Sequence, residues 1–135
     1  MTLIQFFYLY LMTIPAFFLI DMIWLGTVAT KFYQSQIGFL LGHVNWAAAI
    51  IFYLLYIVGI IIFAVNPALE AGSLSKAVVL GALFGFFAYA TYDLTNLSTI
   101  KDWPLLVTVV DLIWGTVLTS SVAGVSYYLG KTFLL

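Results

Sequence analysis

Three aspartates stand inside long apolar stretches of this sequence and are its clearest candidates for chemistry. They are Asp21, Asp93 and Asp111, and none shares its apolar stretch with a lysine or arginine. A charged side chain at the centre of a membrane-spanning helix costs roughly 2.5–3.5 kcal/mol on insertion scales, so such residues usually have a function. We expect these carboxyl groups either to line a functional cavity or to hold helices together through internal hydrogen bonds.

Aromatic and amide side chains accompany the aspartates. Residues three or four positions apart share one helix face, which places Trp24 beside Asp21 and Trp114 beside Asp111. The segments IDMIWLGTV (20–28) and VDLIWGTV (110–117) match closely, and we interpret them as two similar half-sites. The predicted ligand-binding residues are Asp21, Trp24, Tyr92, Asp93, Asn96, Asp111 and Trp114.

Five further residues form a secondary set around the same layer. For His43 and Lys101 an ordinary loop position is the alternative interpretation, and for Trp103 it is an interfacial aromatic belt. The secondary set consists of His43, Asn45, Thr95, Lys101 and Trp103.

Four apolar segments must position these residues. A membrane-spanning helix needs about 20 apolar residues, and four segments meet this length: 3–28, 45–65, 77–96 and 104–129. They predict an all-α integral membrane four-helix bundle, in one domain over residues 1–135, with both termini on the same side. We interpret the first segment as a retained span and not a signal peptide, because no basic residue precedes Lys31.

Several boundary features refine this prediction. Pro15 is expected to kink the first helix, Asn66-Pro67 to end the second, and Pro104 to begin the fourth. The segment Lys31–His43 is predicted to be either a short interfacial helix or an ordered surface loop.

The depth of each aspartate can be estimated from these segments. At a rise of about 1.5 Å per residue, Asp21 and Asp111 lie about 10 Å, and Asp93 about 5 Å, from one membrane face. We call this face side B; it carries the connections 29–44 and 97–103. The three acids are therefore predicted to form one layer, in a cavity that opens toward side B.

Composition excludes several classes of function. The 135-residue chain is 65% hydrophobic and 7% charged, with no cysteine, no arginine and one histidine. Disulfides, thiol chemistry and a histidine-rich metal site are therefore excluded, and we expect no cofactor and no metal. The four lysines form no basic patch, so nucleic acid is not an expected partner.

The stretches IDMIWLG, YDLTNLSTIKDWP and VDLIWGTVLTS resemble a family of small bacterial predicted membrane proteins, domain of unknown function 2177. The resemblance covers essentially the whole chain. It implies a four-span, multi-pass protein of the bacterial inner membrane and implies no established activity. Genes of the family often lie near those of lipid-modifying enzymes, so the resemblance also points to lipids.

The leading hypothesis is a membrane protein that binds a lipid-like or amphipathic cationic ligand between carboxylates and aromatic rings. Three alternatives stay open: a lipid-modifying enzyme with paired aspartates, a proton-coupled small transporter, and a structural partner protein. The expected partners are membrane lipids and a lipophilic or cationic small molecule. A homodimer is a further expectation, because small residues form a ridge at Thr116, Ser120 and Gly124.

Overall fold

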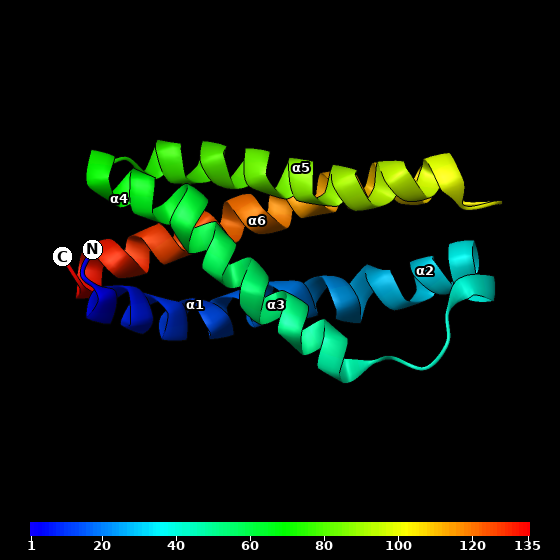
Figure 1. The fold of residues 1–135 in the computed structure, drawn as a ribbon, viewed down its shortest axis with the longest axis horizontal. Helices are drawn as coiled ribbons and strands as arrows, with labels where there is room; N and C mark the ends of the chain where they lie inside the picture. Colours follow the sequence, from blue (N-terminus) through cyan, green and yellow to red (C-terminus); the bar gives the residue numbers. More distant parts are fainter.

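The computed structural model describes residues 1–135 as helices joined by short connections, with no strand. The chain forms four helical rods of 38, 26, 26 and 29 residues, each long and apolar enough to cross a membrane. This confirms the all-α, four-helix membrane architecture that hydropathy predicts. Both chain ends lie at the same end of the bundle (Figure 1), where Gln5 Nε2 donates a hydrogen bond of 3.0 Å to the Leu134 carbonyl.

Two of the rods are composite. The first consists of α1 (Leu3–Trp24), a π-helical turn η1 (Leu25–Ala29), α2 (Thr30–Ile37) and a 3-10 turn η2 (Gly38–Leu40). The second consists of α3 (Trp46–Ile60), a π-helical turn η3 (Ile61–Val65) and α4 (Asn66–Ala71). The third and fourth are the single helices α5 (Leu74–Thr99) and α6 (Leu105–Phe133).

Side chains at the helix starts explain where the rods begin. The Thr2 hydroxyl accepts a hydrogen bond from the Gln5 backbone, while the Gln5 side chain accepts one from the Thr2 backbone. Asn45 caps α3 and Ser73 caps α5 in the same manner, by accepting from a backbone N–H three residues later. Gly72 ends α4 at φ +62°, a left-handed conformation that glycine adopts without steric cost.

The first two rods extend beyond their predicted ends. The segment Lys31–His43 is neither a separate interfacial helix nor wholly a loop, because helix continues from α1 to Leu40. Its apolar residue Ile37 packs against Trp103 and Val107, and this burial stabilises the extension. Asn66-Pro67 does not end the second rod either, since helix continues from the π-helical turn η3 into α4 and Pro67 lies within it.

Buried apolar residues form two separate cores. The larger core fills the end of the bundle that holds the termini and joins α1, α3, η3 and α6 through residues such as Leu9, Phe17, Ile57 and Leu118. The smaller core lies at the opposite end and contains Ile37, Trp103 and Val107. The space between the two cores is where the candidate site lies.

Helices α5 and α6 are in close contact through glycines. A Cβ atom added to Gly85 would lie 2.2 Å from the Gly115 carbonyl oxygen, and one added to Gly81 would lie 2.7 Å from Ala123 Cβ. The GxxxG spacing of Gly81 and Gly85 therefore serves close helix approach. Helix α3 crosses the other rods obliquely and diverges from α5 toward its own N-terminus (Figure 1).

Candidate functional site

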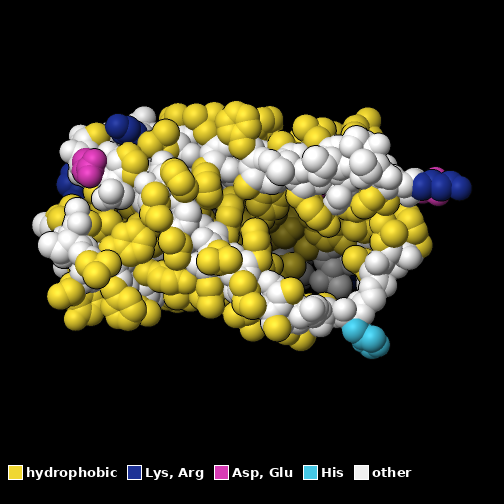
Figure 2. Space-filling model, in the orientation of Figure 1, with side chains coloured by type: hydrophobic (Ala, Val, Ile, Leu, Met, Phe, Trp, Pro, Cys, Tyr) yellow, Lys and Arg dark blue, Asp and Glu magenta, His cyan; other side chains and the backbone are white.

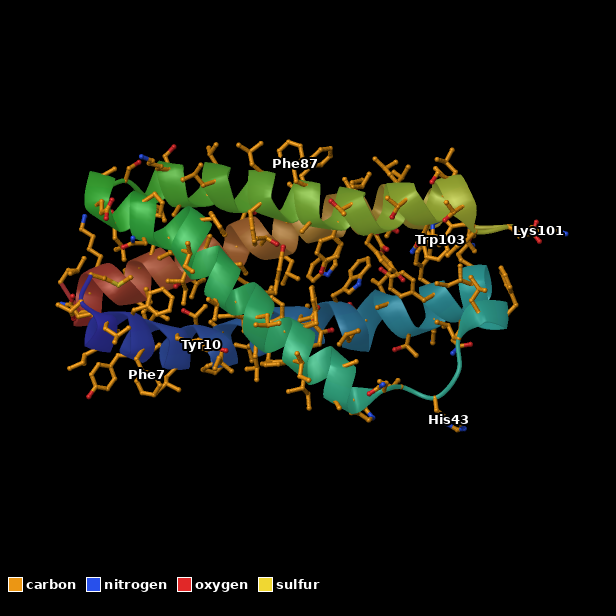
Figure 3. All side chains as sticks on the ribbon, in the orientation of Figure 1. Phe7, Tyr10, His43, Phe87, Lys101 and Trp103 are labelled. Atoms are coloured by element: carbon orange, nitrogen blue, oxygen red, sulfur yellow. The ribbon has the colours of Figure 1, made fainter.

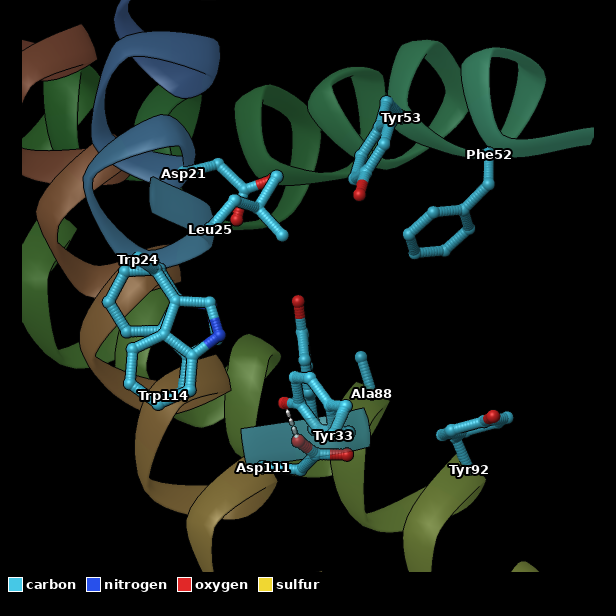
Figure 4. A pocket seen from close by; sticks show the side chains of 11 residues that line it. Asp21, Trp24, Leu25, Tyr33, Phe52, Tyr53, Ala88, Tyr92, Asp111 and Trp114 are labelled. Atoms are coloured by element: carbon cyan, nitrogen blue, oxygen red, sulfur yellow. Dashed lines mark hydrogen bonds between the residues drawn. The ribbon is translucent and has the colours of Figure 1, made fainter. Parts of the chain in front are cut away.

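A cavity of about 530 Å³ lies between the two hydrophobic cores. It appears as a hollow on the long side of the molecule (Figure 2) and is drawn from close by in Figure 4. This volume is within the range of small-molecule sites, about 300–1,000 Å³. The lining residues come from all four rods: Asp21, Trp24, Leu25, Tyr33, Phe52, Tyr53, Ala88, Tyr89, Tyr92, Asp111 and Trp114.

The centre of one wall is a stacked tryptophan pair. The rings of Trp24 and Trp114 have centroids 4.7 Å apart and planes inclined by 10°. They come from α1 and α6, the two helices that carry the matching sequence segments. Each ring therefore belongs to one predicted half-site, and the pair joins the two half-sites into one wall.

The stacked pair separates the two carboxyl groups that line the cavity. Asp21 and Asp111 each precede their tryptophan by three residues, but α1 and α6 run in opposite directions. At about 1.5 Å per residue, the two carboxyl groups are thus offset by about 9 Å along the bundle, on opposite sides of the tryptophans. Figure 4 shows the same order, with Asp21 on one side of the ring pair and Asp111 on the other.

This arrangement corrects the predicted single acidic layer. Asp21 was placed about 10 Å from side B on the assumption that its helix ends near residue 28. The rod continues to Leu40, so Asp21 lies midway along it. Asp93 and Asp111 are neighbours near the side-B end, whereas Asp21 belongs to a second level of the cavity.

Asp21 lies near two possible hydrogen-bond donors and no cation. Its side chain is 5% exposed and faces the cavity, where the Tyr53 hydroxyl and the Trp114 indole are within reach of its carboxyl group. A buried carboxylate without a positively charged partner is unfavourable, so this position favours a ligand that supplies charge.

Asp111 is held by a tyrosine that sequence reasoning did not place in the site. The Tyr33 hydroxyl donates a hydrogen bond to Asp111 Oδ1, drawn as the dashed line in Figure 4. Tyr33 comes from α2, the helix that was expected to be a loop or a separate interfacial element. This hydrogen bond holds one oxygen of Asp111, a residue that lines the cavity and also neighbours Asp93.

Asp93 lies next to Asp111 but does not line the cavity. It is fully buried, and neither of its carboxyl oxygens has a hydrogen-bond partner. Its backbone carbonyl accepts from Thr108 Oγ1 at 3.4 Å, and Thr108 in turn accepts from Trp103 Nε1 at 3.1 Å. Adjacent carboxylates in an apolar interior lose hydration and repel each other, so this pair is an unfavourable arrangement for two negative charges.

The structure brings together five of the seven residues in the predicted ligand-binding set. Asn96, half-buried on α5, and Asp93, behind Asp111, do not line the cavity. Those that do are Asp21, Trp24, Tyr92, Asp111 and Trp114.

The secondary residues lie outside the cavity. His43 and Lys101 point away from the bundle, while Trp103 points inward and belongs to the smaller core (Figure 3). Asn45 is the N-cap of α3, and the Thr95 hydroxyl donates back to the carbonyls of its own helix. Their positions are those of loop, capping and packing residues.

Sequence reasoning missed much of the aromatic lining. Tyr33 and Tyr53 are not among the predicted site residues. Both tyrosines line the cavity, and so do Phe52 and Tyr89. For Tyr89 a signal existed, because it lies four residues before Asp93 on the same helix face; Tyr33 gave none.

The cavity contains carboxyl groups but no cationic side chain. All four lysines are exposed and none lines the cavity; they are Lys31, Lys76, Lys101 and Lys131. The walls are mainly aromatic, and ring faces attract cations. The carboxyl groups and the aromatic walls together favour a ligand that carries a positive charge and an apolar part.

Comparison with known proteins gives one match. No curated protein and no solved structure matches the chain. A family model described as "Predicted membrane protein (DUF2177)" matches residues 6–128, which is most of the chain. The chain therefore belongs to the membrane protein family DUF2177.

Proposed function

We propose that this protein binds the cationic head of an amphipathic membrane molecule in the cavity between its two cores. The observation that carries the proposal is Asp21, a carboxyl group inside the apolar part of a spanning helix that faces a cavity with no cationic side chain in its lining. Intramembrane acids of this kind usually mark a ligand or ion site.

The walls of the cavity support the same ligand class. The Trp24–Trp114 pair presents ring surface between the two carboxyl groups, and Tyr89 and Tyr92 add further rings from α5. A cation near such ring faces gains about 0.5–2 kcal/mol, more as the site is desolvated. The ligand head would lie against the tryptophans with a carboxyl group at either level.

The proposal is tested with dodecyltrimethylammonium as a probe, using protein in phosphatidylcholine nanodiscs. Binding is followed by the fluorescence of the cavity tryptophans. Asp21→Asn should weaken binding about tenfold or more, which corresponds to at least about 1.4 kcal/mol. Dodecanol, which has the same chain and no charge, should bind neither form measurably.

Asp102→Asn is the matched control. Asp102 is exposed in the connection between α5 and α6 at φ +62°, a conformation that asparagine also adopts readily. This variant should bind the probe as the native protein does. Equal binding by the native protein and Asp21→Asn, or equal binding of dodecanol, would refute the proposed function.

A second candidate function rests on Asp93 and Asp111. A fully buried acid beside one that reaches the cavity can pass a proton to or from a bound molecule, which is the arrangement of general acid–base catalysis. We propose a lipid-modifying reaction as the alternative. Lipid extracts from cells that carry native protein or Asp111→Asn test it, and identical lipid profiles would count against any such reaction.

The site of action proposed here is the bacterial inner membrane. The four apolar rods are the kind of segment that an α-helical membrane protein inserts there, since each rod satisfies its own backbone hydrogen bonds. Fractionation of cells that express the tagged protein should place it with inner-membrane markers.

A further inference from the structure

Packed side chains lie at both ends of the cavity along the bundle axis. Toward the termini lies the larger core, with Phe17 and Ile57 fully buried. Toward side B lies the smaller core of Ile37, Trp103 and Val107, and each of these residues is less than 9% exposed. The extended first rod brings Ile37 onto Trp103, so these side chains narrow any route along the axis from side B.

The opening lies on the long side of the bundle, between α3 and α5. Figure 2, viewed across the helix axes, shows the hollow facing the viewer at this position. Two lining residues are largely exposed there: Phe52 of α3 at 50% and Tyr92 of α5 at 58%. Ala88 lies one turn before Tyr92 on the same helix and also lines the cavity.

The geometry of α3 explains why this side is open. Near its C-terminal end α3 packs on α5, where Tyr56 stacks on Phe84 with centroids 5.3 Å apart and Gly59 meets the same ring. From there α3 diverges from α5 toward its N-terminus (Figure 1), and Phe52, one turn before Tyr56, lines the cavity on this side. Apolar side chains cover much of the surface beside the hollow, whereas α5 toward side B is largely polar (Figure 2), with Thr91, Thr95 and Ser98 exposed. The apolar part faces the lipid when the rods span a bilayer.

We infer that the ligand reaches the cavity sideways from the bilayer, through the gap between α3 and α5. This inference rests on the proposed function and adds the route and the ligand class. The ligand is a membrane-dissolved amphiphile whose cationic head enters past Phe52 and Tyr92 while its tail stays in the lipid. Because the tail stays in the lipid, it gains little from binding, and recognition depends on the head.

A photoreactive probe tests the route directly. Dodecyltrimethylammonium with a diazirine at the far end of its tail is bound to the native protein in phosphatidylcholine nanodiscs, irradiated and mapped by mass spectrometry. The label should lie on the rim of α3 and α5, around Phe52 and Tyr92. Label concentrated on the side-B connections, residues 41–45 and 100–104, would overturn lateral access.

The chain has no cysteine, which permits a second test after folding. Ala88→Cys is folded, reconstituted and then modified with a bulky maleimide that should obstruct the gap. The association rate of dodecyltrimethylammonium should fall at least about tenfold relative to the same unmodified variant. Phe87→Cys is the matched control, since Phe87 is the adjacent residue and points away from the cavity (Figure 3).

The two proposals fail in different ways. If the probe binds in a manner that depends on Asp21 but modification at residue 88 leaves its association rate unchanged, lateral access is wrong and the binding function stands. If the native protein does not bind the probe, or Asp21→Asn binds it equally well, the binding function itself is wrong. Equal slowing by modification at residues 87 and 88 would also overturn lateral access.

Discussion

Trp24 and Trp114 stack face to face, with ring centroids 4.7 Å apart, and they hold the cavity's two carboxyl groups on opposite sides of their rings. Offset or stacked aromatic pairs contribute about 0.5–1.5 kcal/mol beyond the area that they bury. Here the pair also joins the first rod to the last one, so it determines the spacing of Asp21 and Asp111.

Trp24→Leu should weaken binding of a trimethylammonium amphiphile by about threefold to tenfold, because it removes both the stacked pair and a ring face for the cation. Equilibrium binding in nanodiscs measures this change. Trp46→Leu is the control, since Trp46 is 67% exposed and lies outside the cavity. Equal losses in the two variants would show that the pair does not form the binding wall.

Tyr33→Phe should lower the free energy of unfolding by about 1.5–3 kcal/mol, the usual contribution of a hydrogen bond to a charged group. The lost bond is the one that the Tyr33 hydroxyl donates to Asp111 Oδ1. Unfolding by titration with sodium dodecyl sulfate in mixed micelles measures the change. Tyr8→Phe should be neutral, because Tyr8 is 53% exposed and its hydroxyl forms no hydrogen bond.

Asp93→Asn should leave stability unchanged or raise it. Both oxygens of Asp93 are buried without a partner, and a neutral amide of the same shape can donate to the neighbouring Asp111. The same unfolding titration checks the result. A loss of more than about 1 kcal/mol would mean that the Asp93 carboxyl has a favourable partner in the membrane, such as a cation or a water molecule.

Gly85→Ala should be among the most destabilising single-methyl changes in this chain. The added Cβ would lie 2.2 Å from a backbone oxygen of α6, so the helices must separate, and overpacking of this kind typically costs about 1–3 kcal/mol. At Gly124 the nearest atom is Val78 Cγ2, at an ordinary 3.5 Å. Gly124→Ala should therefore be neutral or slightly stabilising, and a similar loss at both positions would contradict the close contact.

Hydropathy and local spacing predict the rods and part of the site, but not its full lining. The apolar segments fix the number of spans, and three-residue spacing brings each tryptophan beside its aspartate. Tyr33 could not be placed in this way. On a regular helix it would point about 120° away from Asp21, since twelve residues exceed three turns.

The π-helical turn η1 explains the difference. A π turn accommodates one extra residue, so Tyr33 returns to within about 20° of the Asp21 face. No residue pattern in the segment Leu25–Ala29 predicts a π-helical turn. The turn forms because the packing of α2 on the smaller core stabilises it. The predicted depth of Asp21 below side B is wrong for a related reason: the sequence does not show where the first rod ends.

The close glycine contact between α5 and α6 determines which helix of the cavity wall can move when a ligand binds. With Gly81 and Gly85 directly against backbone and Cβ atoms of α6, these two helices cannot tilt toward each other, and separating them would break their closest packing. Helix α3 packs on α5 near Tyr56 and Gly59. A five-residue connection, residues 41–45, precedes α3. A ligand larger than the cavity must therefore displace α3 outward, with the pivot at the end where α3 meets η3.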